Sequence, residues 1–185
     1  MTSPSTYGPT AIRTPANLIT ALRILATPLV ILLVLHDRRS YAPAIIWFVL
    51  AMTDGFDGFV ARRQGATRSG AFLDPLADKI MVFGAFFGLV YLGRVALVPV
   101  VIMALREVGI SLYRSVVARS GISVPARLLG KIKMILQLLV IELALLPKVS
   151  DTTLVDRLTW VATAFALASA FQYLYDARVR RSGVH

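Results

Sequence analysis

Six long apolar segments restrict the fold of this chain more than any other feature of its sequence. Each has about the 20 residues that an α-helix needs to cross the hydrocarbon core of a bilayer. They cover approximately Asn17–Leu35, Ala42–Val60, Gly70–Leu92, Val95–Val117, Leu128–Leu146 and Leu154–Tyr175. Short connections with polar residues, glycine or proline separate them. The sequence therefore predicts an all-α fold, an integral membrane bundle of six transmembrane helices.

The composition supports this prediction and excludes several other classes of protein. Of the 185 residues, 57% are hydrophobic, which is typical of a single membrane domain and not of a soluble core. The chain has no cysteine, so it has neither disulfides nor a thiolate metal site. Its net charge of +10 is expected to lie at the cytoplasmic surface, against anionic lipid. No nucleic-acid partner is expected, because no separate basic domain is present.

The chain is expected to contain one domain with a short tail at each end. Residues 1–15 are rich in Ser, Thr, Pro and Gly and lack the features of a signal peptide, so we predict a disordered tail. Residues 16–178 form the single six-helix membrane domain, and residues 179–185 form a basic C-terminal tail.

Basic residues predict how the bundle is oriented. They are more frequent before the first segment, after the sixth, and in the connections between segments two and three and between four and five. Cytoplasmic connections of membrane proteins carry such an excess of Lys and Arg. We therefore expect a multi-pass protein of the cell (inner, cytoplasmic) membrane, with both termini and the connection after the second helix in the cytoplasm.

Four aspartates, Asp54, Asp57, Asp74 and Asp78, lie among these apolar residues. Ionised carboxylates are costly in hydrocarbon and require neutralisation. Helical spacing places the first two on one face and the last two on another. Together they form an all-oxygen ligand set, which Mg²⁺, Mn²⁺ and Ca²⁺ prefer. The alternative is a group of exposed acids at helix ends near the water boundary.

The spacing of these aspartates resembles the signature of the CDP-alcohol phosphatidyltransferases. The matching residues are Asp54-x-x-Asp57-Gly58-x-x-Ala61-Arg62 and Gly70-x-x-x-Asp74-x-x-x-Asp78. Members of that family are integral membrane enzymes that transfer a phosphatidyl group from a CDP-activated lipid to an alcohol and release CMP. The resemblance implies that Asp54, Asp57, Asp74 and Asp78 bind Mg²⁺ (or Mn²⁺). It further implies that Asp78 is the catalytic base for the acceptor hydroxyl, and that the enzyme is a homodimer.

The same motif implies a site for the CDP-lipid, formed by Asp57, Gly58, Ala61, Arg62 and Gly70. An arginine after the second aspartate provides a guanidinium that can bind a phosphate through two hydrogen bonds. The two glycines allow the backbone to approach a nucleotide closely. Helix–helix packing through small residues is an equally good explanation for the glycines.

A second group of residues predicts a site for an acceptor phosphate. Arg106 and Arg114 are about two turns apart on one stripe of the fourth segment, and Lys131 and Lys133 begin the fifth. Four cations of this kind suit a dianionic phosphate. In the alternative, Arg106 pairs with Glu107 or Glu142 to hold the bundle together, and the lysines lie at the membrane surface. Lys79, beside Asp78, either balances the aspartates or contacts phosphate.

The pattern of Arg106, Arg114, Lys131 and Lys133 resembles the phosphatidylglycerophosphate synthase branch of the family. The segments Asn17-Leu-Ile-Thr-x-x-Arg23 and Phe72-Leu-Asp74-Pro-Leu-Ala-Asp78-Lys79 also resemble that branch. The branch makes phosphatidylglycerol phosphate and CMP from CDP-diacylglycerol and sn-glycerol 3-phosphate, within a membrane of lipids, during phospholipid biosynthesis. The chain departs from the branch at Arg127, Leu128 and Met134. Two alternatives remain open: the same chemistry with another acceptor (a cardiolipin synthase or a phosphatidylinositol phosphate synthase), or a cation-coupled transporter.

Overall fold

The structure is a computed structural model that describes residues 15–52, 68–119, 128–150 and 153–182. Side chains are described for residues 25–52, 78–117, 128–150 and 153–179. These parts of the chain contain six helices and no strand, so the all-α prediction is confirmed. The helices are α1 (Pro15–His36), a helix over Ala42–Met52, α3 (Arg68–Tyr91), α4 (Leu97–Arg119), α5 (Leu128–Leu145) and α6 (Thr153–Ser182).

Helix α6 is longer than the apolar segment that predicted it, because it continues from Tyr175 to Ser182. The added residues are mostly polar or charged, and several are good helix formers. Hydropathy predicts where an apolar segment ends. A helix can continue beyond that point, because polar residues also form its backbone hydrogen bonds. The 30 residues of α6 give a length of about 45 Å, compared with a hydrocarbon core of roughly 30 Å.

Helix α3 ends in a Schellman motif at Gly93. This glycine has a φ of 71°, a left-handed conformation that costs glycine little. The amide of Arg94 donates to the carbonyl of Leu89 (2.9 Å) and the amide of Gly93 to that of Val90 (3.0 Å). The motif turns the chain between α3 and α4 and places the Arg94 side chain inside the protein, where it is 6% exposed.

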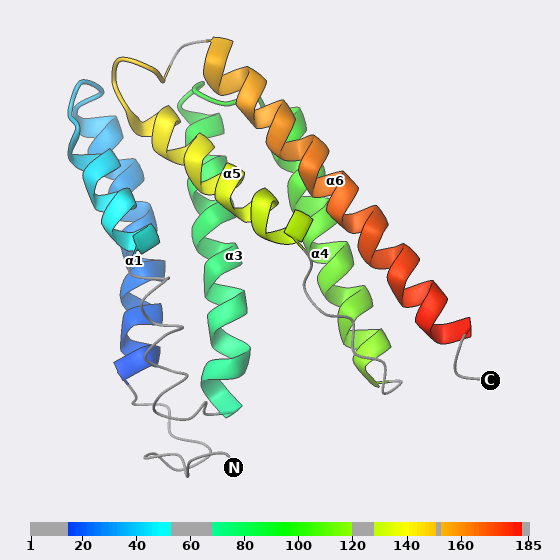
Figure 1. The fold of residues 1–185 in the computed structure, drawn as a ribbon. Coiled ribbons are helices and arrows are strands. Elements are labelled where there is room, and N and C mark those ends of the chain that lie inside the picture. The colour runs from blue at the N-terminus through cyan, green and yellow to red at the C-terminus, as the bar shows by residue number, and fades with distance from the viewer. Residues whose placement is uncertain (1–14, 53–67, 120–127, 151–152, 183–185) are drawn as a thin grey trace.

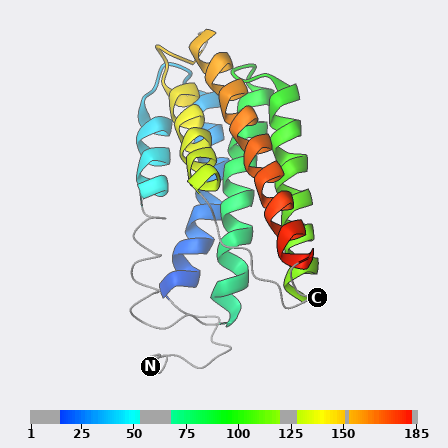
Figure 2. The ribbon, with the colours of Figure 1, turned by 45° about the vertical axis from the view of Figure 1, so that its right-hand side comes forward.

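Helix α3 occupies the middle of the bundle, where it packs against α1, α4 and α5. Helix α6 packs against α4 and α5, and Figures 1 and 2 show it inclined across them. The first turn of α1 and the last turn of α6 lie at the same end of the bundle (Figure 1). The core is built from large side chains with almost no exposure, including Trp47, Phe86 and Ile141.

Large apolar side chains are also exposed on every helix. Examples are Leu25, Ile45, Tyr91, Leu105 and Phe171. Extensive apolar exposure of this kind is expected of a surface that faces lipid. Among the described residues, one helical segment, Thr153–Val179, is long and apolar enough to cross a membrane, judged by length and composition. The helical architecture therefore agrees with the sequence, and the six membrane spans stay a prediction.

Candidate active site

Glu107 of α4 joins two cations through a single carboxylate oxygen. Its Oε2 accepts a hydrogen bond from Arg106 Nη1 at 2.9 Å and another from Lys133 Nζ at 2.5 Å. Lys133 belongs to α5 and is buried. A buried ammonium requires a charged partner, and the carboxylate supplies it. Glu107 thus links α4 to α5 and brings together two of the residues predicted to bind the acceptor phosphate.

Arg106 also connects α4 to α6. Its Nε donates to the carbonyl oxygen of Ala166 at 2.9 Å, and its Nη2 donates to Ser169 Oγ at 2.7 Å. The pairing with Glu107 is the one expected if Arg106 holds the bundle together. Arg106 therefore has a structural role, and its contact with a phosphate stays a prediction.

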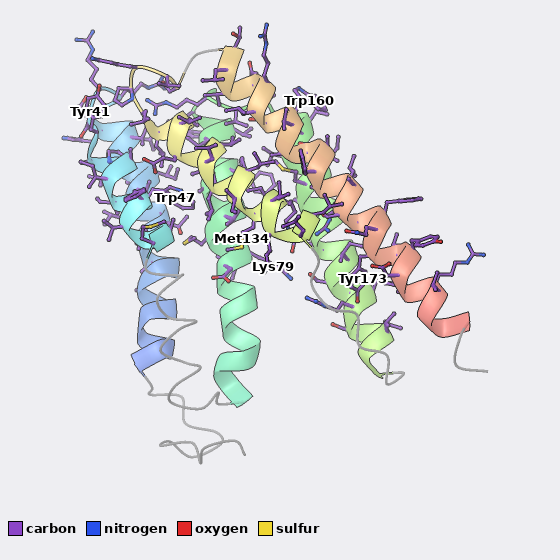
Figure 3. All side chains as sticks on the ribbon, viewed as in Figure 1. Tyr41, Trp47, Lys79, Met134, Trp160 and Tyr173 are labelled. Carbon is purple, nitrogen blue, oxygen red and sulfur yellow. The ribbon has the colours of Figure 1, made fainter. Side chains whose placement is uncertain are left out.

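Lys79 of α3 contacts α4 one turn after Glu107. Its Nζ donates a hydrogen bond to Ser111 Oγ on α4. Ser111 Oγ in turn donates to the backbone oxygen of Glu107 at 2.7 Å. The charge of Lys79 interacts with the charges of both Glu107 and Lys133. Figure 3 shows Lys79 directed away from α3 toward the region where α4 and α5 meet. Two cations, Arg106 and Lys133, therefore contact the Glu107 carboxylate, and Lys79 from a third helix is linked to the Glu107 backbone through Ser111.

The other two predicted acceptor residues lie elsewhere. Arg114 is exposed and its guanidinium carbon lies 5.8 Å from the centre of the Tyr173 ring on α6. Arg106 and Arg114 therefore both face α6, as their common stripe on α4 predicts. Lys131 is exposed whereas Lys133 is buried, because residues two positions apart in a helix point about 200° away from each other around its axis. The structure brings Arg106 and Lys133 together but does not join Lys131 to them.

Most residues predicted to bind metal and CDP-lipid lie outside the described part of the chain. These are Asp54, Asp57, Gly58, Ala61 and Arg62. Gly70 and Asp74 belong to α3, where only the backbone is described over residues 68–77. Asp78 is described and is partly buried. Among the described residues there is no group of three acidic, histidine or cysteine side chains that could hold a metal, so the metal site stays a prediction.

The backbone of α3 nevertheless supports part of the aspartate motif. The helix is continuous from Arg68 to Tyr91, so positions 74 and 78 are about one turn apart on the same side of it. Lys79 follows directly, and adjacent helical residues are about 100° apart. Asp78 and Lys79 therefore leave α3 in different directions, and Lys79 turns toward α4.

A family model described as CDP-alcohol phosphatidyltransferase matches residues 13–172, which is most of the chain. The chain belongs to the CDP-alcohol phosphatidyltransferase family. The match includes the aspartate motif, the cations around Glu107 and most of α6. The family resemblance inferred from the aspartate spacing is therefore confirmed.

Curated proteins of this family resemble the chain along most of their length. A probable phosphatidylglycerophosphate synthase of Mycobacterium tuberculosis is 36% identical, over 90% of this chain and 81% of that protein. A CDP-diacylglycerol–glycerol-3-phosphate 3-phosphatidyltransferase of Shigella flexneri is 36% identical, over 88% and 93% respectively. The Bacillus subtilis protein of the same name is 34% identical, over 71% of each chain. These relatives share the names of the branch that the sequence resembles.

Two residues of this family member were not identified as site residues from the sequence. Ser111 is one turn after Glu107 on α4, and this spacing places it on the same face as the carboxylate. Tyr173 reads as a core or interface aromatic, and its position beneath Arg114 depends on how α4 and α6 pack. The spacing could have revealed Ser111, whereas no sequence signal reveals Tyr173.

Proposed function

We propose that this chain transfers the phosphatidyl group of CDP-diacylglycerol to sn-glycerol 3-phosphate, giving phosphatidylglycerol phosphate and CMP. The observation that carries the proposal is the similarity to relatives named for this reaction, which extends over 81–93% of the length of the Mycobacterium and Shigella proteins. The cations around Glu107 support it, because a phosphorylated acceptor requires positive charge. Such a reaction belongs to phospholipid biosynthesis.

The reaction forms one bond at phosphorus and breaks another. The acceptor hydroxyl oxygen bonds to the phosphorus of the phosphatidyl group, and the pyrophosphate P–O bond breaks, with its electron pair leaving on CMP. The hydroxyl proton passes to Asp78, which acts as the general base. Asp78 follows the third aspartate position by one turn of α3, and this placement supports the assignment.

Mg²⁺ (or Mn²⁺) is the proposed cofactor, held by Asp54, Asp57, Asp74 and Asp78. Carboxylate oxygens are the donors that these hard cations prefer, and two of the four positions share one side of α3. When bound, the ion stabilises negative charge on the phosphates. Asp57, Gly58, Ala61, Arg62 and Gly70 would bind the CDP-lipid, on the strength of the family motif.

The acceptor phosphate would be bound by Arg106, Arg114, Lys131 and Lys133. Arg106 and Lys133 already lie together at Glu107, and Arg114 faces α6 on the same stripe as Arg106. An exposed arginine is available to an incoming substrate, whereas a buried one helps to hold the site in place. Charge-assisted hydrogen bonds make these residues suitable for a phosphate dianion.

The enzyme would lie in the cell membrane as a multi-pass homodimer, with its termini and active site in the cytoplasm. The position of the first turn of α1 and the last turn of α6 at one end of the bundle supports termini on one side (Figure 1). The excess of basic residues in the connections that the sequence assigns to the cytoplasm supports this side. A soluble phosphorylated acceptor would reach the site from there.

An acceptor panel tests the proposal. Purified protein is mixed with CDP-diacylglycerol, Mg²⁺ and one acceptor at a time, namely sn-glycerol 3-phosphate, phosphatidylglycerol or inositol phosphate, and CMP release is measured. We expect release with glycerol 3-phosphate and little with the other two. A preference for phosphatidylglycerol would indicate a cardiolipin synthase, and a preference for inositol phosphate the corresponding synthase. No CMP release with any acceptor would contradict the proposed chemistry.

A further inference from the structure

Lys79 occupies a position that the aspartate motif does not explain. It directly follows Asp78, yet its ammonium group leaves α3 toward α4 and donates to Ser111 Oγ. Ser111 is fixed by its own hydrogen bond to the backbone of Glu107. The residue next to the proposed base therefore belongs, by its contacts, with the cations around Glu107.

We propose that Lys79 binds the phosphate group of the acceptor, together with Arg106 and Lys133, and that Ser111 positions its ammonium for this contact. This inference rests on the proposed function, because it names a further residue for the phosphorylated acceptor. It assigns Lys79 to the acceptor and Ser111 to a supporting role, in which it acts through Lys79.

The charges of this cluster suit a phosphate monoester. Arg106 and Lys133 contact the Glu107 carboxylate, and Lys79 is linked to the Glu107 backbone through Ser111. These four charged side chains together carry a net charge of +2. A phosphate monoester carries about −1.5 to −2 near neutral pH. In an apolar surrounding such a surplus of positive charge is unfavourable without an anion. The acceptor phosphate would supply that anion.

The cluster also retains hydrogen-bond donors for a ligand. An ammonium has three N–H groups, and the described contacts of Lys79 use one of them, with Ser111. The Arg106 guanidinium has five, of which three donate to Glu107, Ala166 and Ser169. The remaining donors come from α3 and α4, and the proposal assigns them to one anion. Lys79 adds the only contribution from the helix that carries Asp78, among the described contacts of this cluster.

Lys79 and Asp78 are adjacent on α3, so acceptor binding and acceptor deprotonation would depend on the same helix. A phosphate held by Lys79 would lie beside α3, and because Asp78 leaves the helix about 100° away, the carbon chain of the acceptor would extend from the phosphate to Asp78. Orientation of the hydroxyl toward its base can lower the activation free energy substantially, because the reacting groups must be held in a narrow range of positions. Lys79 would therefore contribute to acceptor specificity and to acceptor orientation together.

Steady-state kinetics of the purified enzyme test the proposal with two variants and two matched controls. Lys79→Met is expected to raise the KM for glycerol 3-phosphate by about ten- to a hundredfold. The KM for CDP-diacylglycerol and the Mg²⁺ concentration for half-maximal rate are expected to stay within about twofold, because the proposal assigns Lys79 to the acceptor and not to the aspartates. Ser111→Ala should raise the acceptor KM in the same direction by a few fold.

Ser115→Ala and Lys148→Met serve as controls. Ser115 is one turn after Ser111 on the same helix and donates to the Ser111 backbone, but it is exposed. Lys148 is an exposed lysine in the connection after α5. Both controls should keep the wild-type KM values. The inhibition constant of inorganic phosphate against glycerol 3-phosphate provides a second measurement, and it should rise in Lys79→Met in parallel with the acceptor KM.

Several outcomes would overturn the inference. A changed Mg²⁺ requirement with an unchanged acceptor KM would place Lys79 with the aspartates. If Lys79→Met does not fold, Ser111→Ala decides, and a wild-type acceptor KM and phosphate inhibition constant in that variant contradict the proposal. Failure of the proposed function looks different, since wild-type enzyme would then release no CMP with glycerol 3-phosphate.

Discussion

Glu107 and Lys133 form an ion pair between α4 and α5, with 2.5 Å between the carboxylate Oε2 and the ammonium Nζ. A different carboxylate, that of Glu142 on α5, has no such ion pair among the described contacts. Glu142 Oε2 is buried and has no hydrogen-bond partner among the described residues. Two half-buried glutamates in one bundle thus have opposite relationships to their surroundings, and they form a natural pair for mutagenesis.

Glu107→Gln should destabilise the protein, because it leaves the buried Lys133 without its counter-charge. Breaking a buried ion pair costs on the order of 3–5 kcal/mol. Glu142→Gln is the control, and it should be neutral or stabilising, since it removes a charge that has no described partner. Thermal unfolding of both variants in detergent measures the difference. An equal Tm for Glu107→Gln and wild type would contradict the prediction.

Removal of the Arg114 guanidinium should affect one substrate more than the other. Arg114→Ala is expected to raise the KM for glycerol 3-phosphate by about ten- to a hundredfold, with a much smaller change for CDP-diacylglycerol. The ring of Tyr173 lies 5.8 Å from this guanidinium, and an exposed cation–π contact is worth about 0.5–1 kcal/mol. Tyr173→Leu should therefore raise the acceptor KM by about two- to fivefold. Tyr173→Phe, which keeps the ring, should not.

A control for this experiment is available on the same helix. Phe171 is 75% exposed, so Phe171→Leu changes an aromatic residue of α6 without changing the surroundings of Arg114. This control should have wild-type kinetics. Equal losses for both substrates in Arg114→Ala would indicate general damage to the bundle and not a lost contact with the acceptor.

The packing of α1 on α3 depends on Gly88. A Cβ atom at this position would lie 2.5 Å from Ile31 Cδ1 and 2.6 Å from Ile31 Cγ1, which is too close without movement. Gly88→Ala should lower stability by about 1–3 kcal/mol through overpacking. The double variant Gly88→Ala with Ile31→Ala should recover part of this loss, because the obstructing atoms are gone. Thermal unfolding measures both.

Gly109→Ala is the matched control for this prediction. A Cβ at Gly109 meets nothing within 4 Å, and alanine is a better helix former than glycine. We expect this variant to be as stable as wild type or slightly more stable. A loss of stability in Gly109→Ala equal to that in Gly88→Ala would show that any added methyl group is harmful, and that the α1–α3 contact is not special.

Arg94, in the connection between α3 and α4, joins the connection after α1 to the last turn of α5. Its Nη1 donates to the Ala144 carbonyl and its Nη2 to the Arg38 carbonyl, each at 3.1 Å. Arg94→Met should lower the free energy of unfolding by about 1–3 kcal/mol, since both carbonyls lose a charged donor. Arg39→Met is the control, because Arg39 is exposed. Unchanged unfolding of Arg94→Met would contradict the prediction.

Metal removal tests the aspartate motif. Activity should be lost with excess EDTA and return with Mg²⁺ or Mn²⁺, because four carboxylates and a pyrophosphate require positive charge between them. Asp78→Asn should depress kcat while CDP-lipid binding stays within about tenfold, as expected for a lost base. Nucleotide binding in Asp78→Asn as weak as in Asp57→Asn would instead make Asp78 mainly a metal ligand. Full activity in EDTA would contradict the metal assignment.

Much of this protein could be predicted without a structure. The apolar segments predict the helices to within a few residues over most of the chain, because hydrocarbon leaves the backbone no other way to satisfy its hydrogen bonds. The aspartate spacing alone identified the family, since the positions Asp54 to Asp78 reflect chemistry that changes little with packing. Among the described helices, the largest departure from hydropathy is at the end of α6, where the helix continues beyond the apolar residues.

The tertiary structure decided how the cations are used. Helical spacing places Arg106 and Arg114 on one stripe, but only the packing of α4 against α6 determines that Ala166 and Ser169 bind the first and Tyr173 lies under the second. Spacing also left two possible roles for Lys79, namely balancing the charge of the aspartates or contacting a phosphate. Its direction depends on which helix faces α3, and that relationship joins residues far apart in the chain. A sequence specifies the face of each helix, whereas the partner of that face depends on how all the helices pack at once.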